Sequence, residues 1–180
     1  MKDGRLTALH YVERLRESSM MIAALGSSRW FPRSPTLELK QRAESRFLEE
    51  LHIGALYARQ VIALAKKHGW LTEQELELHD ISAWELKARE HRDTYFPLWD
   101  LCSRILHASR IDLEEWYEPS APGEPPEIAF GAFRLQSDHD ERDGVTRTFY
   151  AQEVAGRFAR LAFQVEVKAQ WHSPDPHADE

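Results

Sequence analysis

The chain has 180 residues, of which 42% are hydrophobic and 29% are charged, an ordinary globular balance that suits a single domain. Its net charge of −7 excludes binding to phosphate backbones unless basic residues gather on one face. The single cysteine, Cys102, excludes an intrachain disulfide and a thiolate zinc site within one chain. No apolar run approaches the roughly 20 residues that a membrane-spanning helix needs. The apolar run that begins at Met20 follows acidic as well as basic residues, unlike that of a signal peptide, so we expect a cytoplasmic protein.

The first part of the chain has helical periodicity. Residues 5–25 carry a sparse apolar stripe, and Gly26 after them is a typical C-terminal stop. The stretch Leu37–Trp70 is predicted to be one long amphipathic helix, with Gly69 as its stop. Its apolar stripe consists of Phe47, Leu51, Ala55, Ala58, Ile62 and Ala65. Gly54 inside the stretch indicates either a close helix crossing or a break between two helices.

Shorter helices are predicted to follow. Thr72 and Glu75 have the spacing of a capping box and predict a short helix. Ser82 could cap a further helix that runs toward Asp93. Beyond Pro97, a stripe at helical spacing predicts another helix, consisting of Leu98, Leu101, Cys102, Ile105 and Leu106. The segment from Ile111 to Tyr117 is interpreted as a last acidic turn.

Cys102 is interpreted as a small buried apolar residue of that helix. A cysteine nucleophile needs a base, and His107 lies five positions further on, about 140° around a helix. The sequence therefore does not favour a reactive thiol.

The periodicity changes after residues 119–127, which are predicted to be a linker because their prolines exclude a helix or an interior strand. Three strands are predicted beyond it, Ile128–Gln136, Val145–Glu153 and Phe158–Trp171, with a turn at 154–156. The third strand shows strict alternation, with Leu161, Phe163, Val165, Val167, Ala169 and Trp171 on one face. Residues 172–180 are predicted to be a disordered tail.

These elements predict an α+β fold in a single domain, residues 1–180. An N-terminal helical bundle of about four to five helices is expected over residues 1–118. It would pack on a C-terminal three-stranded antiparallel β-meander over residues 128–171. A three-stranded sheet with one apolar face is not stable by itself. We therefore expect the helices to cover that face.

One motif has the spacing of metal ligands. Glu49 and His52 form Glu-x-x-His, which carboxylate-bridged di-iron bundles use twice, whereas this sequence has it once. Together with His79 and His91 these residues are the candidate metal ligands of one alternative, a metal-binding helical enzyme. No other cofactor and no catalytic residue is predicted, because the glycine-rich phosphate loop, Gly-x-Ser-x-Gly and His-Glu-x-x-His are absent from the sequence.

A second alternative is a DNA-binding regulator of the helix-turn-helix type. Residues 58–90 have the general rhythm of that motif, and a basic cluster ends it, consisting of Lys87, Arg89, His91 and Arg92. The acidic residues Glu73, Glu75 and Glu77 would lie on the recognition helix and face phosphates, which argues against nucleic acid.

Two acidic segments are the candidate partner contacts. The hairpin tip before Gly144 contains Asp138, Asp140, Glu141 and Asp143. It resembles the start of a calcium loop but has Phe149 where the closing glutamate would stand. The acidic turn contains Asp112, Glu114, Glu115 and Trp116.

The size, acidity and missing motifs match the general profile of bacterial immunity proteins, antitoxins and secretion chaperones. We therefore expect a non-catalytic cytoplasmic protein that binds a basic protein partner through acidic surfaces. Membrane binding is not expected, and homodimerisation is left open.

Overall fold

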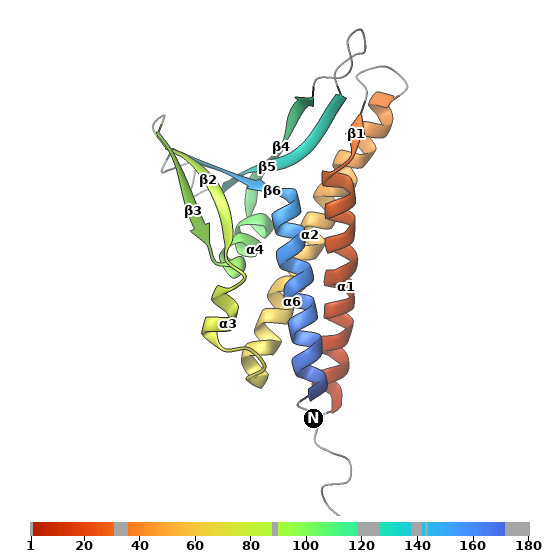
Figure 1. Ribbon diagram of the computed structural model, residues 1–180, viewed down its shortest axis with the longest axis vertical. Coiled ribbons are helices and arrows are strands. Elements are labelled where there is room, and N and C mark those ends of the chain that lie inside the picture. The colour runs from red at the N-terminus through yellow and green to blue at the C-terminus, as the bar shows by residue number, and fades with distance from the viewer. Residues whose placement is uncertain are drawn as a thin grey trace, which may run out of the picture.

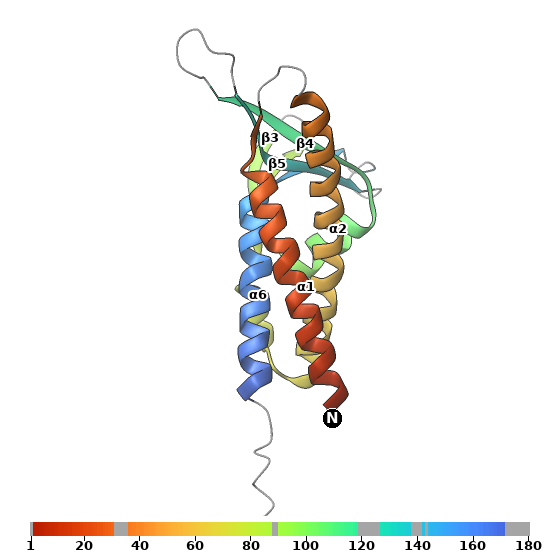
Figure 2. The ribbon, with the colours of Figure 1, turned by 90° about the vertical axis from the view of Figure 1, so that its right-hand side faces the viewer.

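The computed structural model describes residues 2–30, 36–87, 90–118, 127–137, 142 and 144–171, and over these ranges the chain has the predicted α+β architecture. Three long helices lie side by side as a bundle, with an antiparallel sheet toward its upper end in the view of Figure 1 (Figures 1 and 2). The helices are α1 (Lys2–Gly26), α2 (Thr36–His68), α3 (Glu73–Glu77), α4 (Leu98–Leu106) and α6 (Ala151–Trp171).

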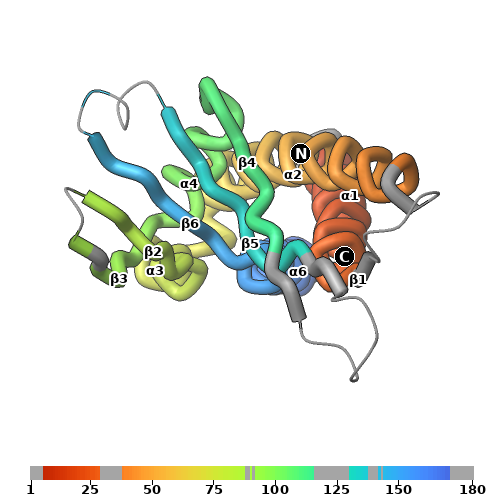
Figure 3. The backbone as a smooth tube through the Cα atoms, turned by 90° about the horizontal axis from the view of Figure 1, so that it is seen from above, coloured from red at the N-terminus to blue at the C-terminus, as the bar shows by residue number. Residues whose placement is uncertain are grey.

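The described residues form one six-stranded sheet in which every pair is antiparallel. Its strands are β1 (Arg29–Trp30), β2 (Ile81–Lys87), β3 (Glu90–Phe96), β4 (Ala108–Glu118), β5 (Glu127–Ser137) and β6 (Val145–Tyr150). Strand β5 pairs with β4 along one side and with β1 and β6 along the other, and β2 and β3 follow β6. Figure 3 shows β4, β5, β6, β2 and β3 side by side in that order.

The long helix α2 forms as its apolar stripe predicted, and it packs on α1, α4 and α6. All six stripe residues are buried, and Gly69 ends the helix with a positive φ of 65°. Gly54 marks a close crossing and not a break, because α2 continues through it. A Cβ atom on Gly54 would lie 2.7 Å from the Phe158 ring of α6 and 3.4 Å from Cβ of Ser18 in α1. In the described ranges no helix is both long and apolar enough to cross a membrane.

One face of the sheet, called the inner face below, packs against α2 and α4. The ring of Phe133 in β5 stacks on that of Phe149 in β6, with centroids 5.7 Å apart, and contacts Phe47 of α2 at 6.1 Å. Arg104 of α4 lies over the ring of Phe96 in β3. Because side chains alternate along a strand, the residues between these inward ones point to the opposite, outer face.

The predicted three-stranded meander is wrong in two ways. The sheet also takes strands from residues 1–118, where only helices were expected. Of the helix predicted from Ser82 toward Asp93, residues 82–87 lie in β2 and residues 90–93 lie in β3, and Ile111–Tyr117 lies in β4. The predicted third strand, Phe158–Trp171, and the turn at 154–156 are both parts of helix α6. The buried residues of α6 recur at the three- and four-residue spacing of a helix and not at the two-residue spacing of a strand. They are Ala151, Val154, Ala155, Phe158, Leu161, Ala162, Val165 and Ala169.

The proline-rich residues 119–126 lie outside the described ranges, as do residues 172–180. Glu118 of β4 pairs with Glu127 of β5, so the segment joins two neighbouring strands of one sheet. The predicted linker was expected to separate a helical part from a β part, but strands precede it as well as follow it.

Candidate functional site

The four candidate metal ligands are spread over three elements. Glu49 and His52 share an exposed face of α2, where Glu49 pairs with Arg46 at 2.7 Å and His52 donates from Nδ1 to a main-chain carbonyl at 2.8 Å. His79 follows α3, and His91 lies in β3. Within the described ranges, no group of three or more histidine, cysteine or acidic side chains is placed to hold a metal ion.

The candidate partner-binding acids of residues 112–116 lie in strand β4 and not in a turn. Their carboxylates pair with basic side chains of the same chain: Asp112 with Arg110, Glu114 with Arg134, and Glu115 with Lys40. The other four candidates, Asp138, Asp140, Glu141 and Asp143, lie outside the described residues. The acids of β4 therefore do not make a surface of unbalanced negative charge.

Cys102 is fully buried in α4, as predicted, and burial raises the pKa of its thiol. A thiol that stays protonated and covered is a poor nucleophile. We expect Ellman's reagent to modify no thiol of the native protein at mildly alkaline pH and one thiol per chain after unfolding in guanidinium. Rapid modification of the native protein, followed by absorbance, would mean that α4 opens readily.

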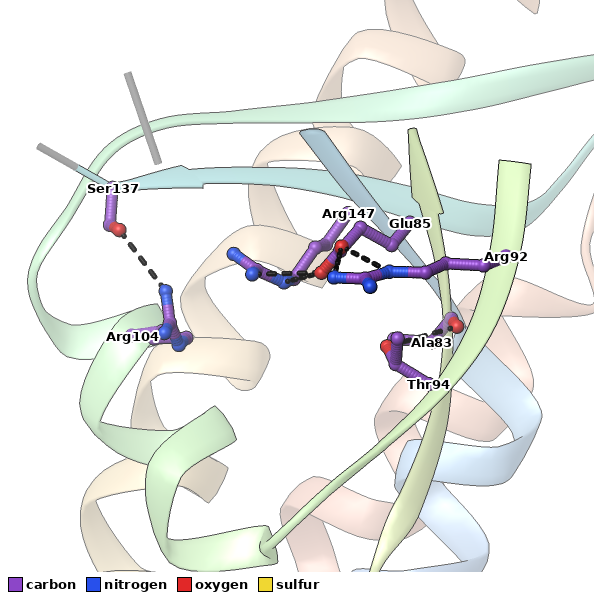
Figure 4. A network of polar contacts seen from close by, with 7 residues as sticks. All are labelled: Ala83, Glu85, Arg92, Thr94, Arg104, Ser137 and Arg147. Atoms are coloured by element: carbon purple, nitrogen blue, oxygen red, sulfur yellow. Dashed lines mark hydrogen bonds and ion pairs between the residues drawn. The ribbon is translucent and has the colours of Figure 1, made fainter. Parts of the chain in front are cut away.

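A carboxylate on the inner face of the sheet joins three strands (Figure 4). Glu85 of β2, 2% exposed, accepts hydrogen bonds from Arg92 of β3 at 2.7 Å and from Arg147 of β6 at 3.0 Å. Arg147 and Arg104 also lie over the Phe96 ring, at 4.9 and 5.2 Å from its centroid.

Burial by itself raises the pKa of Glu85, but the hydrogen bonds and charges of Arg92 and Arg147 outweigh burial and lower this pKa. The carboxylate therefore stays ionised at neutral pH. Each of its oxygens is held by a guanidinium from a neighbouring strand, so the arrangement fixes the alignment of β3, β2 and β6. Its geometry is that of a structural clamp.

The outer face of the sheet exposes a patch of large apolar side chains, which we call the aromatic patch. Its members are Trp84 and Leu86 of β2, Tyr95 of β3 and Tyr150 of β6, with exposed fractions from 39% to 75%. Trp84 lies opposite Thr148 and Asp93 in the sheet, so Tyr150 and Tyr95 are its diagonal neighbours. The patch is therefore contiguous and centred on Trp84.

A pocket of about 380 Å³ opens where α3 meets α2, α4 and α6. Its apolar wall includes the buried side chains of Ile62, Leu98 and Leu161, and its charged residues are Lys66, Glu73, Glu77 and Asp80. The predicted capping box forms α3, with Thr72 accepting from the Glu75 main chain and the Glu75 carboxylate accepting from Thr72.

Glu75 also anchors α3 to α6. Two hydrogen bonds, a stronger one from Lys168 of α6 and a weaker one from the Thr72 main chain, lower the pKa of Glu75 to about 2. This contact holds α3 as one side of the pocket.

His79 lines this pocket and is 1% exposed. Its Nε2 lies 2.7 Å from Oε1 of Gln164 in α6, whereas its Nδ1 is buried and has no hydrogen-bond partner. Burial is the largest cause that lowers the pKa of His79. The positive charges of Arg160 and Arg157 lower this pKa further, and together these effects outweigh the hydrogen bond to Gln164, which raises it. Because the Gln164 oxygen can only accept, Nε2 carries the proton of the neutral ring, and Nδ1 keeps a free lone pair.

Comparison of the chain with protein-family models, curated proteins and solved structures finds no match in any of the three. The sites described above therefore carry the functional argument by themselves.

Of the predicted site residues, His79 lines the pocket beside α3. Glu49 lines a second pocket on the exposed face of α2, and Asp112, Glu114 and Glu115 line a third on β4.

Sequence reasoning missed the aromatic patch because Trp84 was placed in a helix predicted to run toward Asp93, whereas the structure puts Trp84 and Tyr95 in two paired strands. The alternation of Trp84 and Leu86 with Ala83 and Glu85 was the signal that could have found it.

Proposed function

We propose that this protein binds another protein, of basic character, on the outer face of its sheet. The observation that carries the proposal is the aromatic patch, four large side chains from three adjacent strands exposed on the face that the helices α2 and α4 do not cover. Bacterial immunity proteins, antitoxins and secretion chaperones, whose general profile the sequence matches, also act by binding a protein.

The composition of the aromatic patch supports a protein as the ligand. Tryptophan and tyrosine are enriched among the residues that carry most of the binding energy of protein interfaces, and such residues cluster near the centre of the interface. Trp84 is at the centre, and Tyr95 and Tyr150 flank it on the two neighbouring strands. A tyrosine offers a large apolar surface together with a hydroxyl that can bond to a polar partner.

The charges around the patch support a basic partner. On the outer face of the sheet, Asp112 is neutralised by Arg110 and Glu114 by Arg134, which leaves the negative charge of Asp93 beside the patch. Asp93 lies directly opposite Trp84 and makes no ion pair with any described residue. The whole chain has a net charge of −7, which would steer a positively charged protein toward it.

The test is site-specific photo-crosslinking in extract of the cells that naturally express the protein. A photoreactive phenylalanine analogue replaces Tyr95, which is 75% exposed, and in a matched control it replaces Phe163, which is 61% exposed on α6. We expect one discrete adduct from position 95, whose partner is a basic protein by mass spectrometry, and none from position 163.

Two further results decide the proposal. The substitution Trp84→Ser should reduce the adduct about tenfold or more, as expected of a central aromatic anchor, and raised salt should weaken its formation. An adduct with a second copy of the chain would make the aromatic patch a homodimer interface. That outcome, an acidic partner, or equal adducts from positions 95 and 163 would each overturn the proposal.

A further inference from the structure

The pocket beside α3 combines an apolar wall with negative charge. Lys66 and Glu73 pair with each other at 2.9 Å, so their charges cancel. Glu77 and Asp80 also line the pocket, and neither makes an ion pair with a described residue. Two carboxylates thus stand next to an apolar cavity without a compensating cation in contact.

His79 adds a second, independent feature of the same pocket. Its ring is neutral, and its Nδ1 lone pair is buried without a donor. A buried acceptor that lacks a partner is unfavourable in a folded protein, and a ligand that supplies an N–H group removes that cost. Because Lys66 is paired with Glu73, no described residue supplies a donor to Nδ1 of His79 or a paired cation to Glu77 and Asp80, while the pocket already holds a surface for an apolar group.

We propose that this pocket binds a small organic ammonium ion, a primary amine with an aliphatic or aromatic body. The body would lie on Ile62, Leu98 and Leu161, and the ammonium group would donate hydrogen bonds to the carboxylates and to the free nitrogen of His79. A volume of about 380 Å³ holds a ligand of roughly ten heavy atoms, near the small end of the usual range for ligand pockets.

A primary amine fits this set of groups better than the other ligand classes. A carboxylate or phosphate ligand would meet two acids and an acceptor, which repel it. An uncharged alcohol could fill the apolar cavity but would leave both carboxylates without a cation. A divalent metal would need at least three protein ligands in one cluster, and the described residues contain no such group.

The ligand should bind less tightly as the pH falls. Burial and the neighbouring Glu77 raise the pKa of Asp80, the positive charge of Arg157 opposes this rise, and Asp100 adds to it. The ionised carboxylate is the form that attracts an ammonium ion. Affinity should therefore be full at neutral pH and fall as Asp80 takes up its proton, above the pH at which an ordinary aspartate does so.

Titration calorimetry with 2-phenylethylamine tests the proposal, with 2-phenylethanol and 3-phenylpropanoate as neutral and anionic probes of similar shape. We expect the amine to bind at least about tenfold more tightly than the alcohol and the carboxylate not to bind. The double substitution Glu77→Gln, Asp80→Asn should weaken amine binding at least about tenfold. The control Glu49→Gln removes an exposed acid of α2 that does not line the pocket and should leave the affinity unchanged.

Chemical-shift changes in NMR spectra identify the site independently of affinity. The amine should shift resonances of Leu76, Trp99 and His79, which line the pocket, and should leave those of Trp84 and Tyr95 unchanged. Equal affinity for amine and alcohol, retention of binding by the double variant, or shifts confined to other surfaces would overturn the proposal. None of these outcomes bears on protein binding by the sheet, which is tested separately through Trp84.

Discussion

Replacing Gly54 by alanine should lower the free energy of unfolding by about 1–3 kcal/mol, because it adds a methyl group to a crossing that is already filled. The new Cβ would lie 2.7 Å from Cε2 and 3.0 Å from Cδ2 of Phe158, whose side chain is completely buried. Helix propensity alone predicts the opposite sign, a gain of about 1 kcal/mol for alanine over glycine. Urea unfolding followed by circular dichroism therefore distinguishes packing from propensity by the direction of the change.

Gly156 of α6 provides the matched control for this substitution. A Cβ atom there meets nothing within 4 Å, so Gly156→Ala should raise the free energy of unfolding by about 0.5–1 kcal/mol. Shortening the opposing ring with Phe158→Leu should cost less in the Gly54→Ala protein than in the wild type, because the smaller side chain relieves the contact. If both glycine substitutions stabilise the protein equally, α1, α2 and α6 do not cross as closely as described.

Local signals in the sequence were sufficient for most of the helices. The capping box at Thr72, the glycine stop at Gly69 and the apolar stripe of α2 each depend on residues within a few turns of one another. These features were predictable because the physical cause and its effect lie in the same segment. For Gly54 the sequence left a helix crossing and a helix break open, and the continuity of α2 together with the contact to Phe158 decides for the crossing.

Helix α6 was missed because its sequence supports two periods at once. From Phe158 onward, apolar residues alternate as in a strand, but Phe163 in that series is 61% exposed. The helical stripe begins earlier, in Ala151–Ala155, where a strand end and a turn were predicted. Gly156 was taken as a turn residue, although it lies on the exposed side of the helix. A predicted strand of 14 residues is also longer than strands usually are, and that length favoured the helix.

The pocket and the aromatic patch depend on elements distant in sequence. His79 meets Gln164 of α6, and Trp84 gains its neighbours from β3 and β6. The sequence marked His79 as one of several histidines, but nothing local indicated that its Nδ1 would be buried without a partner. Tertiary packing creates both sites, so composition and spacing could not locate them.

Strand β2 was mistaken for a helix because one of its inward positions holds a charge. Ile81, Ala83 and Glu85 point to the inner face, and a glutamate in this series conceals the alternation. The same residue completes an apparent capping box with Ser82. In the structure Ser82 donates instead to Glu153 of α6, and Glu85 accepts from two arginines.

Replacing this glutamate by glutamine should be among the most costly single substitutions in the sheet. Glu85→Gln keeps the volume of the side chain but leaves Arg147, 12% exposed, without its anionic partner. Removing one member of a buried ion pair costs about 3–5 kcal/mol, and we expect the lower end, about 3 kcal/mol, because Arg92 is 66% exposed and can be hydrated. The control Glu114→Gln breaks a more exposed pair with Arg134 in the same sheet and should change stability by less than about 1 kcal/mol.

The pH dependence of this loss identifies its cause as charge. The pKa of Glu85 is lower in the folded protein than in the unfolded chain, so its contribution to stability is fully present above the unfolded value of about 4.3. It is lost as the pH falls through the folded pKa, because both states then bind the proton. The difference in free energy of unfolding between wild type and Glu85→Gln should therefore stay constant from neutral pH down to about pH 5 and narrow below about pH 4. A difference that persists unchanged in acid would mean that hydrogen-bond geometry, and not the ionised carboxylate, aligns the three strands.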